Sequence, residues 1–123
     1  MAEPRPFLTE PAICLNTAGG VQIATPPRLN LIVGTQLMAV KLVLPAGFDH
    51  PWHNHPEHES MGVVVRGRVR MRIGDDDDIE LGPGDVWHHP VGVYHTTHAP
   101  QEAWVVEMHS PLRPDLVGLR DKE

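Results

Sequence analysis

The chain has 123 residues, of which 41% are hydrophobic, so it is long enough to fold as one globular domain around a single core. Its ten basic and sixteen acidic side chains give a net charge of −6, which argues against a protein that binds the phosphates of nucleic acid. The single cysteine, Cys14, excludes an internal disulfide. No apolar run is long enough to cross a membrane, and the first residues lack the apolar segment of a signal peptide, so we expect a cytoplasmic protein.

Thirteen prolines and eleven glycines interrupt the chain so often that long helices have no room. We expect an irregular N-terminal arm at residues 1–20, a β-barrel at residues 21–110 and a frayed polar tail at residues 111–123. Apolar runs and apolar–polar alternation predict short strands at residues 21–23, 29–33, 37–44, 68–73, 79–81, 86–88, 93–98 and 104–108. Many short strands joined by turns are typical of an all-β sandwich or barrel.

Metal-ligating side chains are concentrated between Gly47 and Gly67. This stretch contains four histidines and two glutamates: His50, His53, His55, His58, Glu57 and Glu59. His53 and His55 are two residues apart, so on a strand both rings point to the same face. Two neutral imidazoles on one face form half of a site for Zn, Fe, Ni, Cu or Mn. Taken alone, the stretch is also compatible with a solvated, histidine-rich loop.

A second stretch, residues 84–95, adds a histidine that follows two closely spaced turns. Together the two stretches resemble the paired motifs of the cupin superfamily. The matching residues are Gly47, His53, His55 and Gly67 in the first motif, and Gly84, Pro90, Gly92 and His95 in the second. The chain departs from the second motif at Ala99, where the family has asparagine.

The cupin resemblance implies a double-stranded β-helix, or jelly roll, built from two packed sheets. It also implies that His53 and His55 come from one strand at the barrel mouth and His95 from a neighbouring strand. Three histidines would bind one divalent transition metal and leave open positions for water or substrate.

The position of a fourth ligand has two interpretations. Counting back from Gly67 places Ser60 there, whereas counting forward from His55 places Glu59 there. Neighbouring strand residues face opposite ways unless a bulge intervenes, so only one of the two faces the metal. With Glu59, the predicted ligands are three histidines and a carboxylate, which the family uses for iron or manganese. With Ser60, water completes the site, and zinc, nickel or copper is favoured.

The residues that follow the barrel carry a further resemblance. Ser110, Pro111, Arg113, Asp115 and Leu116 are similar to a tail found in the one-domain cupins that linearise unsaturated uronates in pectin breakdown. Those relatives carry glutamine where this chain has Glu59 or Ser60. The resemblance implies a lyase- or isomerase-like, non-redox enzyme that acts on a small hydroxylated carboxylate or sugar acid.

Catalysis of that kind requires a proton-transferring group near the metal, and the candidates are Glu59, Glu107 and His109. Two alternatives stay open. One is a metal-dependent dioxygenase that uses the open positions for oxygen. The other is a non-catalytic sensing or storage barrel whose metal is structural.

Two segments, residues 37–44 and 61–65, are apolar on both faces and hold more apolar surface than one small core needs. Similar cupins commonly pair, often with the arm of one subunit on the sheet of the other, so we expect a homodimer. His88 and His89 are adjacent, so at most one faces inward. Residues predicted for the core include Trp87, Trp104, Met38, Met61, Met71 and Met108.

Overall fold

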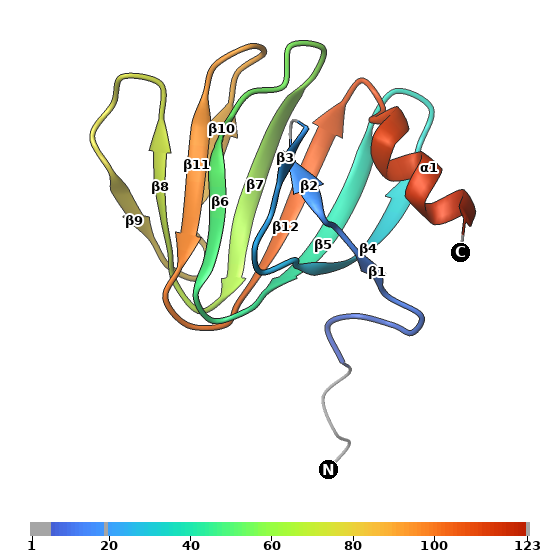
Figure 1. The fold of residues 1–123 in the computed structure, drawn as a ribbon, viewed down its shortest axis with the longest axis horizontal. Helices are drawn as coiled ribbons and strands as arrows, with labels where there is room; N and C mark the ends of the chain where they lie inside the picture. Colours follow the sequence, from blue (N-terminus) through green and yellow to red (C-terminus); the bar gives the residue numbers. More distant parts are fainter. Residues whose placement is uncertain (1–5, 19, 123) are drawn as a thin grey trace.

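The computed structural model of the protein describes residues 6–18 and 20–122, which form twelve strands and one helix (Figure 1). The strands are β1 (Ile13–Cys14), β2 (Thr17–Ala18), β3 (Val21–Gln22), β4 (Arg28–Val33), β5 (Met38–Leu44), β6 (Phe48–His53), β7 (Glu59–Arg66), β8 (Val69–Ile73), β9 (Ile79–Leu81), β10 (Val86–His89), β11 (His95–Ala99) and β12 (Ala103–Ser110). The helix is α1 (Pro114–Lys122).

Two antiparallel sheets form the barrel. The large sheet has the strand order β1-β4-β5-β12-β7-β10, and the small sheet has the order β6-β11-β8-β9. The short β2–β3 hairpin contacts β6 and crosses the middle of the view in Figure 1. This arrangement confirms the predicted all-β jelly roll.

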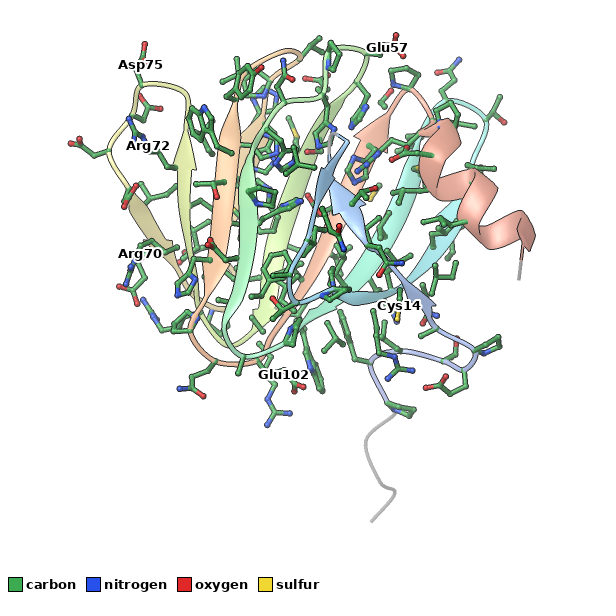
Figure 2. The ribbon with its side chains drawn as sticks, in the orientation of Figure 1. Cys14, Glu57, Arg70, Arg72, Asp75 and Glu102 are labelled. Atoms are coloured by element: carbon green, nitrogen blue, oxygen red, sulfur yellow. The ribbon has the colours of Figure 1, made fainter. Side chains whose placement is uncertain are left out.

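Alternation along the strands separates a buried inner face from an outer face. In β5 the buried residues Met38, Val40, Leu42 and Leu44 alternate with less buried ones, including the exposed Lys41. In β8 the residues Val69 and Met71 face the core, while Arg70 and Arg72 point away from the barrel (Figure 2). Both sheets contribute to one core, so the chain folds around a single apolar centre as its length predicts.

Gly62 shows how tightly the large sheet is packed. It lies opposite Trp87 in the β7–β10 pairing, and the indole occupies the space where a side chain would be. A Cβ atom at position 62 would lie 2.1 Å from the ring of Trp87, which is closer than any van der Waals contact. The predicted core position of Trp87 therefore depends on a glycine across the sheet.

Trp104 lies on the outer face of the large sheet, and its prediction as a core residue is wrong. The ring of Phe7 stacks on it with centroids 4.9 Å apart, and Lys41 Nζ donates a hydrogen bond to the Phe7 carbonyl at 3.2 Å. The described part of the N-terminal arm thus packs on the sheet of its own chain. Within residues 1–20 the structure adds two short strands to the expected irregular arm, β1 and β2, which pair with β4 and β3.

The predicted frayed tail is a helix. Pro114 begins α1, and Asp115 lies in its first turn, where a negatively charged carboxylate stabilises the helix through its dipole. Leu116 is buried in the core, and the Arg113 N–H donates to Met38 Sδ at 3.3 Å. Leu112, Val117 and Leu119 also pack against the core, so the tail is fixed by several apolar side chains and by Arg113.

Two of the four methionines predicted for the core lie elsewhere. Met38 and Met71 are buried, but Met61 and Met108 are 56% and 41% exposed. Both exposed residues lie on the outer face of the large sheet. Among the described residues, no helix is long and apolar enough to span a membrane.

Candidate metal centre

Three histidines converge inside the barrel. His53 ends β6 and His95 begins β11, and the two residues lie opposite each other in the antiparallel pairing of these strands. His55 follows two residues after His53. One ring nitrogen from each histidine lies within 4.8 Å of the others, and the Nε2 atoms of His53 and His55 are 3.1 Å apart.

His55 reaches this cluster from a loop. The cupin resemblance implied that His53 and His55 share a strand, but β6 ends at His53 and the next strand begins at Glu59. The two rings nevertheless meet edge to face, with centroids 4.8 Å apart. The expected convergence holds, although its source differs from the prediction.

Hydrogen bonds to carbonyl groups orient two of the three rings. The Nδ1 of His53 lies 2.6 Å from the Pro51 carbonyl oxygen, and the Nδ1 of His95 lies 3.3 Å from that of Val93. A carbonyl oxygen only accepts hydrogen bonds, so Nδ1 is the protonated nitrogen in both neutral rings. The Nε2 atoms are therefore free to bind a metal, which is how backbone carbonyls commonly fix metal-binding histidines.

Burial keeps these rings in the form that binds metal. It lowers the pKa of His53 below its usual value, lowers the pKa of His95 to about 4, and depresses the pKa of His55 strongly. All three are therefore neutral at pH 7. Two nitrogens about 3 Å apart also fit a single ion that lies about 2 Å from each. The donor set and its geometry fit a divalent transition metal.

Four further histidines surround the cluster: His50, His58, His89 and His109. The ring of His89 stacks on that of His95 with centroids 3.6 Å apart, and His58 lies beside both His55 and His109. Each of the four has one buried ring nitrogen without a hydrogen-bond partner among the described residues. Buried polar atoms normally have partners, so these nitrogens are available to a bound molecule.

No role in the site was predicted from the sequence for His50, His58 or His89. A signal for His89 was present, because it lies two residues after the buried Trp87 and therefore on the same face of β10. His88 between them is exposed, so the prediction that at most one of the adjacent pair faces inward is confirmed.

Glu59 and Ser60 face opposite sides of β7. Ser60 is only 2% exposed, and its Oγ lies 3.3 Å from Nδ1 of His89 on the inner face. Glu59 is exposed, and its carboxylate accepts a hydrogen bond from His88 Nε2 at 2.9 Å. The β7–β12 register is regular here, so no bulge turns Glu59 inward. The structure thus does not bring Glu59 to the three histidines.

Glu107 and His109 lie on the inner face of β12 and line the cavity of the barrel. Burial raises the pKa of Glu107 to about 7, although the nearby Arg113 guanidinium opposes this shift. Burial also lowers the pKa of His109 to about 3, so its ring is neutral. The cavity therefore holds one carboxyl group that exchanges a proton near neutral pH.

Arg113 is the cationic side chain among the residues that line this cavity. Its side chain is only 7% exposed, and its Nε and Nη2 donate to the two carboxylate oxygens of Asp115 at 3.2 and 2.7 Å. Apolar side chains such as Leu42, Phe48 and Met71 also line the cavity. The cavity thus combines histidines, one carboxyl group and one guanidinium with apolar side chains.

A jelly roll with three convergent histidines in its interior defines a class of barrel that can bind metal. Residues 40–110, more than half of the chain, match the sequence profile of the Cupin domain family. The chain therefore belongs to the cupin family, as its two motifs predict.

The chain is similar to several known proteins of this kind. Over 61 residues the chain is 34% identical to dimethylsulfoniopropionate lyase DddQ from Ruegeria pomeroyi, a match that covers 50% of this chain but 30% of the lyase. KdgF from Halomonas sp. is similar with a TM-score of 0.69 and 26% identity, over 73% of this chain and 84% of KdgF. An RmlC-like cupin from Shewanella frigidimarina matches with a TM-score of 0.70 and 24% identity, over 94% of this chain and 99% of its own, which supports the fold.

Proposed function

We propose that this cupin is a metal-dependent enzyme that carries out a lyase- or isomerase-like, non-redox step on a small hydroxylated carboxylate or sugar acid. One observation carries the proposal. Two of the three convergent histidines, His55 and His95, line one cavity together with Glu107, whose pKa is raised, and the buried Arg113. A metal site, a proton-transferring group and a binding group for an anion are the parts that such a reaction needs.

His53, His55 and His95 would hold the metal. Three protein ligands leave coordination positions for substrate oxygens, as in catalytic rather than structural sites. When bound, a divalent metal polarises a carbonyl or hydroxyl oxygen and acidifies the neighbouring C–H and O–H groups. Because Ser60 and not Glu59 faces inward, the protein supplies no carboxylate at the fourth position that the motif predicts. This favours zinc, nickel or copper over iron or manganese.

Arg113 would bind the substrate carboxylate. A guanidinium pairs well with carboxylates because its donors are planar and it stays charged at all physiological pH values. Asp115 holds Nε and Nη2, which fixes the direction of the side chain and leaves N–H groups of Arg113 for a ligand. His58 and His109 each have a buried ring nitrogen without a partner among the described residues, and these nitrogens offer further contacts to substrate oxygens.

Glu107 would transfer the proton. A general base works best when its pKa is close to the working pH, and burial raises that of Glu107 to about 7. In the proposed step its carboxylate takes a proton from a substrate carbon. As the neutral acid it then returns that proton to another carbon or to an oxygen of the substrate, so no electrons leave the molecule. His109, two residues along β12, is the second candidate.

Two resemblances support this reaction class. DddQ is named as a lyase that acts on a propionate derivative, and the matched segment includes 50% of this chain. The residues around Arg113 are similar to those of the uronate-linearising cupins. Both resemblances concern carboxylate substrates.

The test has two stages. Metal analysis of the purified protein identifies the ion, and the protein loaded with that ion is then assayed against unsaturated uronates and related keto acids while oxygen is recorded. We expect turnover of at least one carboxylate without oxygen consumption. Oxygen uptake coupled to substrate loss would instead establish a dioxygenase, and a metal-loaded protein without turnover on the whole panel would favour a sensing or storage barrel.

We also propose that the protein is a homodimer that pairs through the outer face of the large sheet. A hollow there is lined almost entirely by apolar residues of β7, β10 and β12, among them Met61, Val86 and Met108. Val86 is 71% exposed. Contiguous apolar surface of this kind marks an interface, and a second copy would bring an equally apolar surface to it.

A further inference from the structure

We propose that Asn54 is a positioning residue that fixes His55 for metal binding, an inference that rests on the proposed metal site. Two hydrogen bonds, here called the 54–92 latch, carry it. Asn54 Nδ2 donates to the Gly92 carbonyl oxygen at 3.1 Å, and the Gly92 N–H donates to the His55 carbonyl oxygen at 3.0 Å. The N–H and the C=O of Gly92 thus both bind the loop that carries His55.

The three metal-binding histidines differ in what holds their backbone. His53 and His95 belong to β6 and β11, and the ladder of the small sheet places them opposite each other. His55 lies between β6 and β7, and none of the strand pairings among the described residues includes it. Since a loop has more conformational freedom than a paired strand, His55 is the ligand whose position needs a separate restraint.

The latch provides that restraint from the turn that precedes His95. Val93 N–H donates to the Pro90 carbonyl at 3.2 Å and closes the turn, and Gly92 adopts a φ of +75° within it. This left-handed conformation, which glycine adopts without strain, belongs to the residue that makes both latch bonds. The turn leads into β11 at His95. The latch therefore ties the loop ligand to the chain segment that carries a strand ligand.

The side chain of His55 makes no hydrogen bond among the described residues that could hold the loop in place of the latch. Among the described residues, its only side-chain hydrogen bond is the Nε2 contact with His53, and both of these nitrogens would be taken up by a metal. Its other neighbours are the rings of His58 and His95, with centroids 4.4 and 5.3 Å away. The backbone of the loop must therefore be held independently of the metal ligands.

Loss of the Asn54 bond should weaken metal binding without removing a ligand. Outer groups that orient ligands typically contribute about 10- to 100-fold to metal affinity. We expect the Kd for Zn²⁺ of Asn54→Ala, measured by competition with a chelator, to rise by about tenfold. Asn30→Ala is the matched control, because its amide donates to the Thr9 carbonyl at 3.0 Å on the N-terminal arm, and its Kd should stay unchanged.

A double-mutant cycle separates positioning from general stability. If Asn54 acts through His55, then Asn54→Ala should have no further effect on Zn²⁺ affinity once His55 is alanine. An equal loss of affinity in both backgrounds would show that Asn54 merely stabilises the fold, and would overturn the proposal. Unchanged affinity in the single variant would do the same.

A readout without metal tests the latch itself. The Gly92 amide should exchange with solvent slowly in the wild-type protein and at least severalfold faster in Asn54→Ala, because the two latch bonds support each other. Equal exchange rates in the two proteins would overturn the latch even if the metal site and the proposed reaction are correct. Wild-type protein that binds Zn²⁺ but turns over no carboxylate would contradict the proposed function and leave the latch intact.

Discussion

The inner and outer faces of β7 and β12 place similar side chains in different surroundings. On the inner face, Ser60 of β7 and the Glu107–His109 pair of β12 lie beside the histidine cluster. On the outer face the same strands present Glu59, Met61 and Met108 to solvent. One pair of strands therefore builds both the candidate active site and the candidate dimer surface.

The two glutamates show what this difference means chemically. Glu59 is exposed and pairs with His88, and exposed pairs of this kind contribute little because water screens them. Glu107 lines the cavity, where burial raises its pKa to about 7. Side-chain identity alone does not distinguish a surface carboxylate from a proton-transferring one, and the face of the strand decides.

Removal of the three inner ligands should have the largest effect. The triple alanine variant of His53, His55 and His95 should bind no metal, whereas wild-type protein should bind roughly one ion per chain, since the three nitrogens are the donor set. Metal analysis after gel filtration measures this. The control is a variant in which His88 and His98 are replaced, because they lie on the less buried faces of β10 and β11. Full occupancy in the triple variant would contradict the assignment.

Exchange of the two glutamates gives the next largest effect. Glu107→Gln keeps the shape of the side chain but removes the proton-transferring group, so kcat should fall by about 10²- to 10⁴-fold with the metal retained. Glu59→Gln alters only the outer face and should change kcat by less than about twofold. Steady-state kinetics on the substrate found in the survey measures both, and equal losses in the two variants would refute the distinction between the faces.

How far the sequence predicted this arrangement depends on what positions each residue. Alternation and turn residues predicted many short strands in a sandwich or barrel, whereas the jelly roll and the two strand ligands, His53 and His95, were implied by the resemblance to the cupin motifs. The position of His55 did not, because His-x-His spacing is the same on a strand and in a loop. The latch that holds His55 joins residues 54 and 92, a contact that only the fold creates.

Other errors have the same origin. Trp104, Met61 and Met108 are apolar residues that occupy outward positions, and hydrophobicity alone does not tell an inner face from an outer face that another segment or subunit covers. Helix α1 was missed because four of its nine residues are charged and the others carry little helical periodicity. In the structure Leu116 is buried, Val117 and Leu119 pack against the core, and Arg113 precedes the helix. The choice between Glu59 and Ser60 required the β7–β12 register.

Acidification should destabilise the metal-free protein through its inner histidines and not through its outer ones. Burial lowers the pKa of His95 to about 4, of His109 to about 3 and of His89 to about 2, against a usual value of about 6.5. For each histidine, between its lowered pKa in the folded chain and the usual value of about 6.5, the unfolded chain binds a proton that the folded chain does not. The stability of the metal-free protein is therefore highest above about pH 6.5 and falls on acidification, by about 2 kcal/mol for each such histidine at pH 5.

Glu107 has the opposite effect on the pH dependence of stability. Its pKa is raised, so its contribution is present below its unfolded pKa of about 4.5 and is lost as the pH rises toward 7. One carboxyl cannot offset several histidines, so we expect net acid destabilisation. Urea unfolding at pH 7.5 and 5.0 measures it. His89→Asn should reduce the difference between the two pH values, whereas His88→Asn on the outer face should not, and a pH-independent wild type would contradict the buried, neutral state of the inner rings.

Charge placed on the outer face should leave the site intact and change only assembly, the smallest of these effects on turnover. The wild type should scatter light as a dimer of about 27.4 kDa, twice the 13.7 kDa chain, because pairing covers Met61, Val86 and Met108. Val86→Asp would place a carboxylate in each copy of the apolar contact and should yield monomers with kcat changed by less than about twofold. Ile32→Asp, 76% exposed on β4 of the same sheet, is the matched control and should stay dimeric. A monomeric wild type over a wide concentration range would refute the interface, and a monomeric variant with lost turnover would mean that the outer face also supports the site.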